Sequence, residues 1–213
     1  MRTLLLALPL LAALPLAARA DDKPSDFLKA DNWVGLMDYW KVDGTTVTGA
    51  SPKDGLKSNT FLCSKKKYKD FEMNFLIKLS GGPDANSGIQ IRSQLLDTKN
   101  YAVGGPQCDI GANYWGSLYG ERFSKEGKIG GGHMMKGADA KKVNAVLKKD
   151  DFNDYRIKCV GKHVTVSING VTTVDEDFDI MPAEGIIAFQ LHVTKTPMEV
   201  TFKNIEFKDL SAK

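Results

Sequence analysis

Polar side chains that could bind or transform a ligand alternate with apolar residues in three short stretches of this chain. They are Gln90, Arg92 and Gln94 in SGIQIRSQ, Gln107 and Asp109 in PQCDIG, and Gln190 and His192 in AFQLHV. Successive side chains of a strand point to opposite faces, so each stretch directs its polar groups to one side. If these faces share one sheet surface, they form a patch of guanidinium, carboxylate, imidazole and amide groups. If they do not, they are ordinary solvated faces.

The segment GPQCDIGANYWGSLYGERF, residues 105–123, adds aromatic rings and a second carboxylate to this set. Amides and carboxylates form directed hydrogen bonds with vicinal hydroxyls, and a ring such as Trp115, Tyr114 or Tyr119 offers an apolar face to a pyranose. The glycines allow the backbone to turn sharply and to approach a ligand closely. The composition therefore favours a carbohydrate site. The expected substrate-binding residues are Gln90, Gln107, Trp115, Tyr119 and Gln190.

The elements that must position these residues are mainly β-strands. Apolar residues alternate strictly in EMNFLIKL (72–79) and in KHVTVSING (162–170), as in half-buried strands. Further strands are expected near residues 47, 61, 90, 157, 189 and 203, with a bulge at Lys203–Asn204 where the alternation changes phase. One short helix is expected within 140–149, and 122–138 reads as irregular. This pattern predicts an all-β, two-sheet antiparallel jelly-roll sandwich.

The N-terminal segment MRTLLLALPLLAALPLAARA has the features of a secretory signal peptide. A basic residue precedes an apolar stretch that ends in a small-x-small cleavage pattern at Ala20. The apolar stretch is interrupted by Pro9 and Pro15 and is short for a bilayer span, which needs roughly 20 residues. We therefore expect a signal peptide over 1–20, a single domain over 21–213, and a periplasmic or secreted protein without a membrane anchor.

Charge and cysteine content exclude some classes of protein and leave others open. The formal net charge is only +3 and the lysines are scattered, which argues against nucleic acid as a partner. The chain has three cysteines, Cys63, Cys108 and Cys159, so at most one disulfide can form, and burial as small hydrophobic residues is the favoured interpretation. The acidic run 175–179 is expected to be a solvated turn, with a Ca²⁺ site as the alternative.

The sequence also resembles a known family. NSGIQIRSQ, GPQCDIGANYWGSLYGE, NDYRIKCVGKHVTVSINGV and GIIAFQLHVTKTPMEVTFKNIEFKDL are similar, in this order, to motifs of the 3-keto-disaccharide hydrolase domain of bacterial exported proteins. The resemblance extends from DNWVGLMDYWKVDGTTVTG to the C-terminal strand. It implies a concanavalin-like jelly roll, and activity on glycosides whose C3 carries a ketone.

Such a substrate implies a reaction in which a base removes the proton on C2 and the group on C1 is eliminated, after which water adds back. The site needs a base, a group that stabilises the enolate oxygen, and an acid for the leaving oxygen. We expect Asp109 or His192 as the base, Arg92 for the enolate, and Glu121 or Tyr119 for the leaving group. A divalent cation beside Arg92 is an open alternative, and no other cofactor is expected.

Three alternatives to this reaction remain. Ordinary glycoside hydrolysis needs two carboxylates about 5 to 10 Å apart, and Asp109 with Glu121 is the one attractive pair. A lectin-like module would bind the same oligosaccharides without chemistry, because a fold does not fix a function. A structural cell-surface domain would have its polar residues scattered over the surface.

Overall fold

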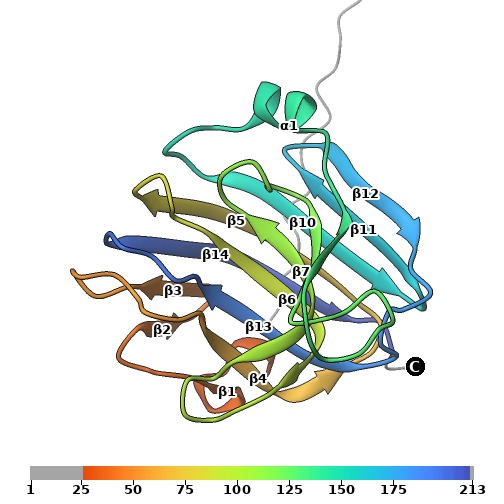
Figure 1. Cartoon of the computed structure of the whole chain (residues 1–213), viewed down its shortest axis with the longest axis horizontal. Coiled ribbons are helices and arrows are strands. Elements are labelled where there is room, and N and C mark those ends of the chain that lie inside the picture. Colours follow the sequence, from red (N-terminus) through yellow and green to blue (C-terminus); the bar gives the residue numbers. More distant parts are fainter. Residues whose placement is uncertain (1–25, 212–213) are drawn as a thin grey trace, which may run out of the picture.

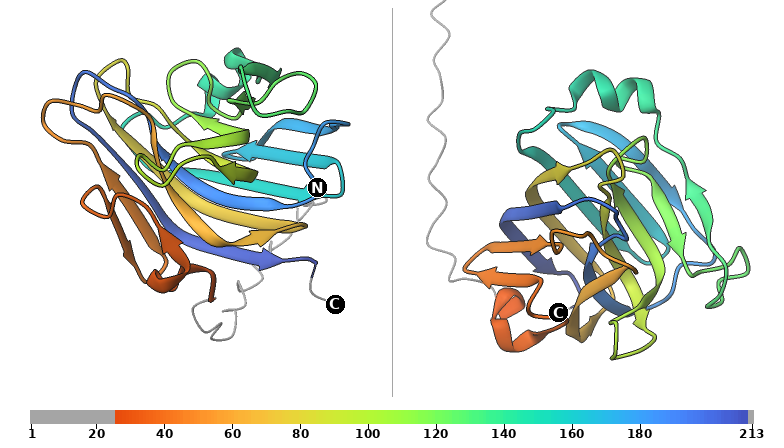
Figure 2. Two further views of the ribbon diagram at one scale, coloured as in Figure 1. Left: turned by 60° about the horizontal axis from the view of Figure 1, so that its bottom comes forward. Right: turned by 60° about the vertical axis from the view of Figure 1, so that its left-hand side comes forward.

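The computed structural model describes residues 26–211, so the expected signal peptide lies outside the described residues. Two seven-stranded antiparallel sheets pack face to face (Figures 1 and 2). Sheet A has the order β1 (Trp33–Val34), β4 (Thr60–Tyr68), β13 (Gly185–Leu191), β6 (Ser87–Leu95), β7 (Val103–Ile110), β8 (Leu118–Glu121) and β9 (His133–Lys136). Sheet B has the order β12 (Val171–Asp177), β11 (His163–Ile168), β10 (Asn153–Val160), β5 (Phe71–Gly81), β14 (Met198–Asp209), β3 (Thr46–Ala50) and β2 (Trp40–Asp43). The jelly-roll prediction is confirmed.

The hydrophobic core lies between the two sheets. In β5 the alternate residues Met73, Phe75 and Ile77 are buried, as the period of two predicts, and β11 alternates in the same way. The three central strands of sheet A behave differently, because β6, β7 and β13 have almost every residue buried. Their inner face joins the core through Ile89, Cys108 and other apolar side chains. Their outer face therefore buries the polar residues of the same strands.

Register shifts interrupt this regular alternation in several strand pairs, and two of them bear on the sequence predictions. The register between β14 and β5 shifts between Lys203 and Glu206, and Asn204 has a φ of 53°, which confirms the bulge predicted there. A second shift lies in β6, where the pairing with β7 changes between Gln90 and Gln94 and Arg92 has a φ of 45°. The sequence did not predict this second bulge, and it changes the direction of the Arg92 side chain.

Helix is confined to short segments. The helix expected within 140–149 is α1 (Ala140–Val146), which begins where the Asp139 carboxylate accepts hydrogen bonds from the N–H groups of Lys141 and Lys142. Near the N-terminus lie the 3₁₀ turns η1 (Asp26–Leu28) and η2 (Ala30–Asn32). The stretch expected to be irregular contains the edge strand β9. No helix within residues 26–211 has the length and apolar character needed to cross a membrane.

All three cysteines are buried as free thiols, as predicted. Cys108 and Cys159 lie in the core between the sheets, and Cys63 belongs to a smaller apolar cluster that includes Phe61 and Ala188. Burial raises the pKa of the Cys63 thiol to about 12 and that of the Cys159 thiol to about 11. The thiols therefore stay protonated and act as packing groups rather than nucleophiles.

Candidate functional site

The outer face of sheet A brings together three glutamines and an aspartate from three strands. Gln90 of β6 lies opposite Gln107 of β7 and opposite Ala188 of β13. The amide Nε2 of Gln107 lies 2.8 Å from Asp109 Oδ1 and 3.2 Å from Gln190 Oε1. Gln90 Nε2 donates to Gln107 Oε1 over 2.8 Å. We call these four residues the amide–carboxylate cluster, and the prediction that they share one face is confirmed.

The amide–carboxylate cluster is almost wholly buried, with Asp109 5% exposed and the three glutamines 0–2% exposed. Gly88, which pairs with Asp109, makes room for it: a Cβ at Gly88 would lie 2.6 Å from the Gln107 amide carbon. Nearly all buried polar groups in proteins have hydrogen-bond partners, yet Gln190 Nε2 has none among the described residues. This N–H group is a donor available for a further acceptor.

Burial determines the protonation of Asp109. The pKa of its carboxyl is raised to about 7: removal from water raises it most, the hydrogen bond from Gln107 lowers it, and the nearby charge of Glu121 raises it. The Asp109 backbone is fixed, because its carbonyl oxygen accepts hydrogen bonds from Tyr155 Oη and from the N–H of Gly116, both over 3.0 Å. A carboxyl with this pKa exchanges protons readily near neutral pH.

Strand β8 adds a tyrosine and a second carboxylate beside the cluster. Tyr119 pairs with Gln107 and Glu121 pairs with Gly105 across the β7–β8 ladder. Partial burial raises the pKa of Tyr119, and the charges of Glu121 and Asp109 raise it further. Tyr119 and Glu121 are two residues apart on β8, and Tyr119 lies opposite Gln107, so both side chains lie on the face of sheet A that carries Asp109. The ring of Tyr114 also lies within range of Tyr119.

Two residues that sequence reasoning missed hold Glu121 in place. Its Oε1 accepts hydrogen bonds from Arg122 Nη1 over 2.9 Å and from Asn59 Nδ2 over 3.3 Å. The other end of the Asn59 amide accepts the N–H of Val193 over 2.8 Å. Asn59 therefore connects Glu121 to the segment that carries His192. The only sequence feature that could have indicated a role for Arg122 is its position next to Glu121 in GERF. No sequence feature indicated a role for Asn59.

His192 directly follows β13 and is half-buried. Its Nδ1 lies 2.7 Å from the carbonyl oxygen of Val193. With Nδ1 protonated for that contact, Nε2 is left as the basic nitrogen of the ring. The structure thus places His192 beside the Asn59 link rather than in the amide–carboxylate cluster itself.

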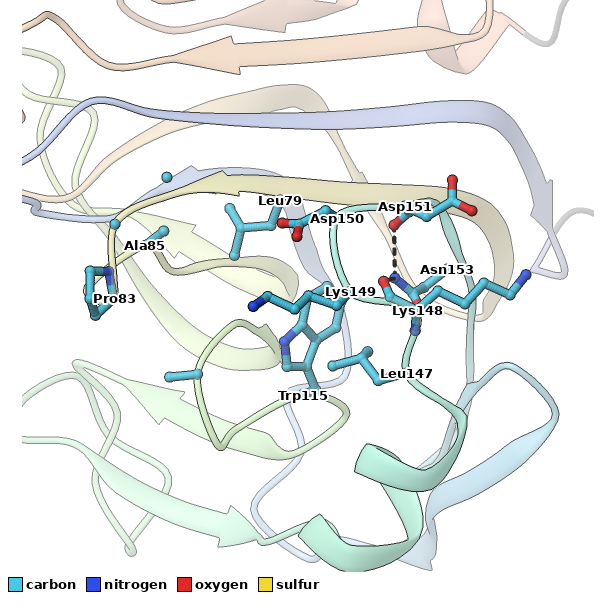
Figure 3. A pocket seen from close by; sticks show the side chains of 13 residues that line it. Leu79, Pro83, Ala85, Trp115, Leu147, Lys148, Lys149, Asp150, Asp151 and Asn153 are labelled. Carbon is cyan, nitrogen blue, oxygen red and sulfur yellow. Dashed lines mark hydrogen bonds between the residues drawn. The ribbon is translucent and has the colours of Figure 1, made fainter.

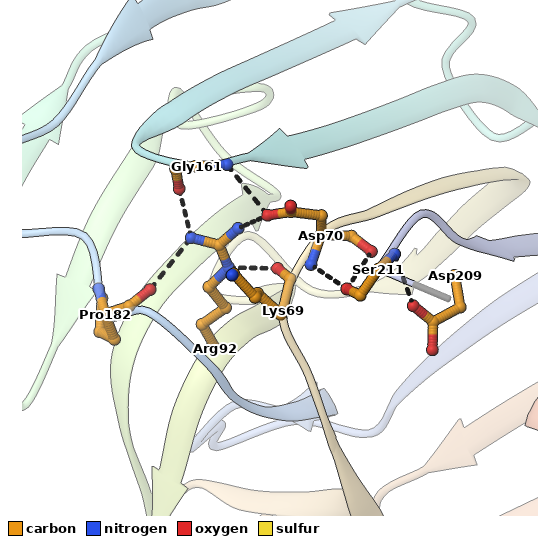
Figure 4. Close-up of polar contacts among 7 residues, drawn as sticks. All are labelled: Lys69, Asp70, Arg92, Gly161, Pro182, Asp209 and Ser211. Atoms are coloured by element: carbon orange, nitrogen blue, oxygen red, sulfur yellow. Dashed lines mark hydrogen bonds and ion pairs between the residues drawn. The ribbon is translucent and has the colours of Figure 1, made fainter. Parts of the chain in front are cut away.

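The expectation that Arg92 shares this polar face is wrong. The bulge in β6 reverses its alternation, and Arg92 is 1% exposed at one end of the sandwich (Figure 4). Its guanidinium donates to Asp70 Oδ1 over 2.8 Å and to the carbonyl oxygen of Pro182 over 3.0 Å. It also donates to the carbonyl oxygens of Lys69 and Gly161. Arg92 therefore joins three chain turns and does not face the cluster.

Trp115 also lies apart from the amide–carboxylate cluster, contrary to the expectation that it forms a wall of that site. It packs against the core and lines a separate pocket, which we call the end pocket (Figure 3). Its lining residues are Leu79, Gly81, Gly82, Pro83, Ala85, Ala112, Trp115, Leu147, Lys148, Lys149, Asp150, Asp151 and Asn153. The aromatic ring on the face of the cluster is that of Tyr119 instead.

Acidic side chains of the run 175–179 form ion pairs and hydrogen bonds with basic residues. His163 bridges Asp175 and Asp177, with nitrogen–oxygen distances of 2.9 and 2.7 Å, and these contacts raise the pKa of its imidazole. Lys136 pairs with Glu176 over 2.8 Å. No group of three or more His, Cys, Asp or Glu residues suited to a metal ion occurs within residues 26–211. Residues 175–177 end strand β12 instead of forming the expected turn, and their carboxylates pair with these basic side chains.

Comparisons with known proteins agree with this fold. A family model described as the 3-keto-alpha-glucoside-1,2-lyase-like domain matches residues 25–208. A candidate glycosyl hydrolase from Parabacteroides distasonis ATCC 8503 is 22% identical, with a TM-score of 0.60 over 88% of this chain and 98% of that chain. The carbohydrate-binding module CBM66 from Bacillus subtilis is 13% identical, with a TM-score of 0.58 over 83% of this chain and 95% of that chain. No curated protein matches the chain. These structural likenesses establish the fold.

Proposed function

Because this chain belongs to the 3-keto-alpha-glucoside-1,2-lyase-like domain family, we propose that it cleaves glycosides whose C3 carries a ketone. The ketone acidifies the hydrogen on C2, and the glycosidic oxygen on C1 lies in position for β-elimination. We further propose that the protein acts outside the cytoplasm, on oligosaccharides or other 3-keto-glycosides. The single observation that carries the catalytic part is the buried Asp109, whose pKa is about 7, beside Glu121 and Tyr119.

In the proposed reaction the Asp109 carboxylate takes the proton from C2, which leaves an enolate on the C3 oxygen. The enolate electrons form a C1=C2 double bond as the C1–O bond breaks, and the C3 ketone is restored. Tyr119 or Glu121 gives a proton to the leaving oxygen, which departs as an alcohol. Before water adds, the Asp109 carboxyl exchanges its proton with solvent. Water then adds to C1 and gives a proton back to Tyr119 or Glu121, while Asp109 gives a solvent-derived proton to C2, so the net result is hydrolysis.

Asp109 suits both halves of this reaction. A base must be ionised for the first step and an acid must be protonated for the last, and a pKa of about 7 leaves both forms populated near neutral pH. His192 stays the alternative base, since its Nε2 is the free nitrogen of the ring. The donor proposed for the enolate oxygen is the N–H of Gln190 Nε2, in place of Arg92, because this buried group has no partner among the described residues.

The glutamines support the two protonation states of Asp109. In the structure, Gln107 donates a hydrogen bond to the Asp109 carboxylate, which fits the ionised form of Asp109. If Gln90 is turned over, its Nε2 donates to Pro106 O over 3.2 Å and to Ser93 Oγ over 2.6 Å, and its oxygen faces Gln107 at 2.8 Å. A turned Gln107 then presents its oxygen to Asp109, which fits the protonated carboxyl. The amide chain can therefore match either state.

The proposal is tested by incubating the purified protein with a 3-keto-disaccharide in D₂O. Cleavage accompanied by deuterium at C2 is expected for the wild type, because the proton returned to C2 comes from solvent. Asp109→Asn is expected to reduce both signals strongly, and His192→Ala tests whether the imidazole contributes to the proton transfer. Cleavage without deuterium at C2 would contradict proton abstraction and point to direct displacement at C1, as in ordinary glycosidases.

A saccharide-binding module without chemistry is the second candidate function. It is favoured by the three neighbouring amides of the cluster, which suit hydroxyl recognition as well as catalysis. The same experiment separates the two candidates. Saturable binding of several 3-keto-disaccharides with no cleavage of any of them would identify a binding module.

A further inference from the structure

The end pocket around Trp115 is built by three loops that meet at one end of the sandwich (Figure 3). The β5–β6 loop contributes Gly82, Pro83 and Ala85, and the β7–β8 loop contributes Ala112 and Trp115. The segment after α1 contributes Leu147 to Asp151. None of the lining residues belongs to the amide–carboxylate cluster, so the pocket is a second site. We propose that the end pocket binds a neutral sugar unit of an oligosaccharide.

The floor of the pocket is apolar and aromatic. One part of the Trp115 side chain packs against the core, together with Leu79 and Leu147, while the residue as a whole stays half-exposed at the pocket. A core-anchored indole with an accessible face suits a pyranose ring, whose C–H groups pack on aromatic surfaces. The Trp115 residue is partly exposed at the pocket and its indole N–H forms no hydrogen bond within residues 26–211, so it can donate to a sugar hydroxyl.

The rim of the pocket carries charged side chains that are free to contact a ligand. In the part of the chain that the structure describes, neither Lys149 nor Asp150 has a side-chain hydrogen bond or ion pair. Their segment is nevertheless well fixed: Asn153 Nδ2 donates to the carbonyl oxygens of Lys148 and Asp151, both over 3.0 Å. Asn153 Oδ1 accepts the N–H of Lys148 over 2.8 Å. An ammonium and a carboxylate are thus held at the edge of an aromatic floor.

The charge balance of the rim selects the class of ligand. Two lysines, Lys148 and Lys149, are matched by two aspartates, Asp150 and Asp151, so the rim has no net charge. An anionic or cationic ligand would gain little from such a rim, because attraction from one pair is offset by repulsion from the other. Hydroxyl groups can donate to the carboxylates and accept from the ammonium groups. A neutral saccharide therefore fits better than an acidic or amino sugar.

The backbone of two lining loops adds independent support. Ala112 has a φ of 45° and Asp150 a φ of 57°, in the left-handed region that residues with a Cβ rarely adopt. Such a conformation is strained and recurs at ligand-binding loops, where the surroundings enforce it. Both residues line the end pocket, from two different loops.

The experiment uses ligands that the proposed reaction cannot consume. Maltotriose, cellotriose and xylotriose carry no C3 ketone, so binding by the full protein is measured without turnover by titration calorimetry and tryptophan fluorescence. Trp33 and Trp40 are both 4% exposed, so a change in fluorescence on binding reports Trp115. We expect one of the three saccharides to bind. Trp115→Ala and Lys149→Ala are expected to weaken binding about tenfold or more.

Matched variants make the outcome decisive. Tyr114→Ala removes an exposed ring of the same loop that does not line the pocket, and Asp109→Asn alters the amide–carboxylate cluster. Both are expected to leave the affinity unchanged. Asp150→Asn tests the rim without disturbing the core, should Trp115→Ala fold poorly. Absence of binding by all three saccharides, or loss of binding only in Asp109→Asn, would overturn the second site. Either result leaves cleavage of 3-keto-disaccharides, and hence the proposed function, unaffected.

Discussion

The side-chain amide of Gln107 donates a hydrogen bond from Nε2 to Asp109 Oδ1 over 2.8 Å. This bond favours the ionised carboxylate and lowers its pKa, while burial and the charge of Glu121 act in the opposite direction. Burial is the largest of the three effects, so the pKa settles at about 7. Changes at the two neighbours should therefore move the pH dependence of activity in opposite directions.

Substitution of Gln107 by Met should raise the pKa of Asp109, because the hydrogen bond that stabilises the carboxylate is lost. If ionised Asp109 is the base, the acidic limb of the pH profile of kcat/KM then moves to higher pH. The measurement is that profile on a 3-keto-disaccharide. Gln90→Met is the control, since Gln90 bonds to Gln107 and not to Asp109. If the acidic limb of the profile does not move in Gln107→Met, Asp109 is not the titrating base.

Substitution of Glu121 by Gln should lower the pKa of Asp109, because a nearby negative charge is removed. The acidic limb of the same profile is expected at lower pH than in the wild type. If Glu121 also protonates the leaving oxygen, kcat falls most for the poorest leaving groups. Glu126→Gln, in an exposed loop, is the control for loss of a carboxylate. A shift to higher pH would contradict the assigned interaction.

Asp109→Asn should lower the catalytic activity and raise the free energy of unfolding. Between pH 4 and 7 the folded wild type keeps a proton on Asp109 that the unfolded chain has lost, so its free energy of unfolding falls as the pH rises. At about 1.4 kcal/mol per pKa unit, the total reaches up to about 4 kcal/mol at pH 8. The amide of the Asp109→Asn variant does not titrate, so the free energy of unfolding of the variant does not fall in this way. The difference in free energy of unfolding between the variant and the wild type should therefore grow from pH 4 to 8.

Urea unfolding of both proteins at several pH values measures that difference, and groups that titrate in both proteins cancel. Activity of the variant on a 3-keto-disaccharide should fall by about 10²- to 10⁴-fold, as for loss of a general base. A stability difference that does not change with pH would show that Asp109 has an ordinary pKa.

The fold was predictable because most strands obey simple alternation. The apolar residues of 72–79 and 163–168 point to the core in β5 and β11 as the period of two requires. The bulge at Asn204 was predictable too, since the apolar phase changes there. The edge strand β9 was not, because its four residues, HMMK, are too few for a periodic pattern and follow a run of glycines.

The same rule located part of the site and misplaced another part. Gln107 and Asp109 lie on one face of an uninterrupted strand, so alternation placed them correctly. Alternation failed at Arg92, because one extra residue in a strand sends the following side chain to the other face. Nothing in the sequence marks this bulge, since its left-handed position is occupied by an arginine rather than by glycine or asparagine.

Arg92 provides the final prediction, which concerns stability. Its buried guanidinium is held by one carboxylate and three carbonyl oxygens, from Asp70, Lys69, Gly161 and Pro182 (Figure 4). Arg92→Ala leaves these acceptors without a donor and leaves a cavity in place of the side chain. The free energy of unfolding should fall by roughly 3–5 kcal/mol, as when one partner of a buried ion pair is removed. Urea or thermal unfolding at pH 7 measures the loss.

Arg156 is the matched control for this change. It forms a bidentate pair with Asp154, with distances of 2.8 and 3.3 Å, but its side chain is 62% exposed. Water screens such a pair, so Arg156→Ala should cost less than about 1 kcal/mol. The difference between the two variants isolates burial, because the chemical change is the same. Equal effects would mean that the Arg92 contacts are no stronger than a surface ion pair, and that its role in joining three turns is not structural.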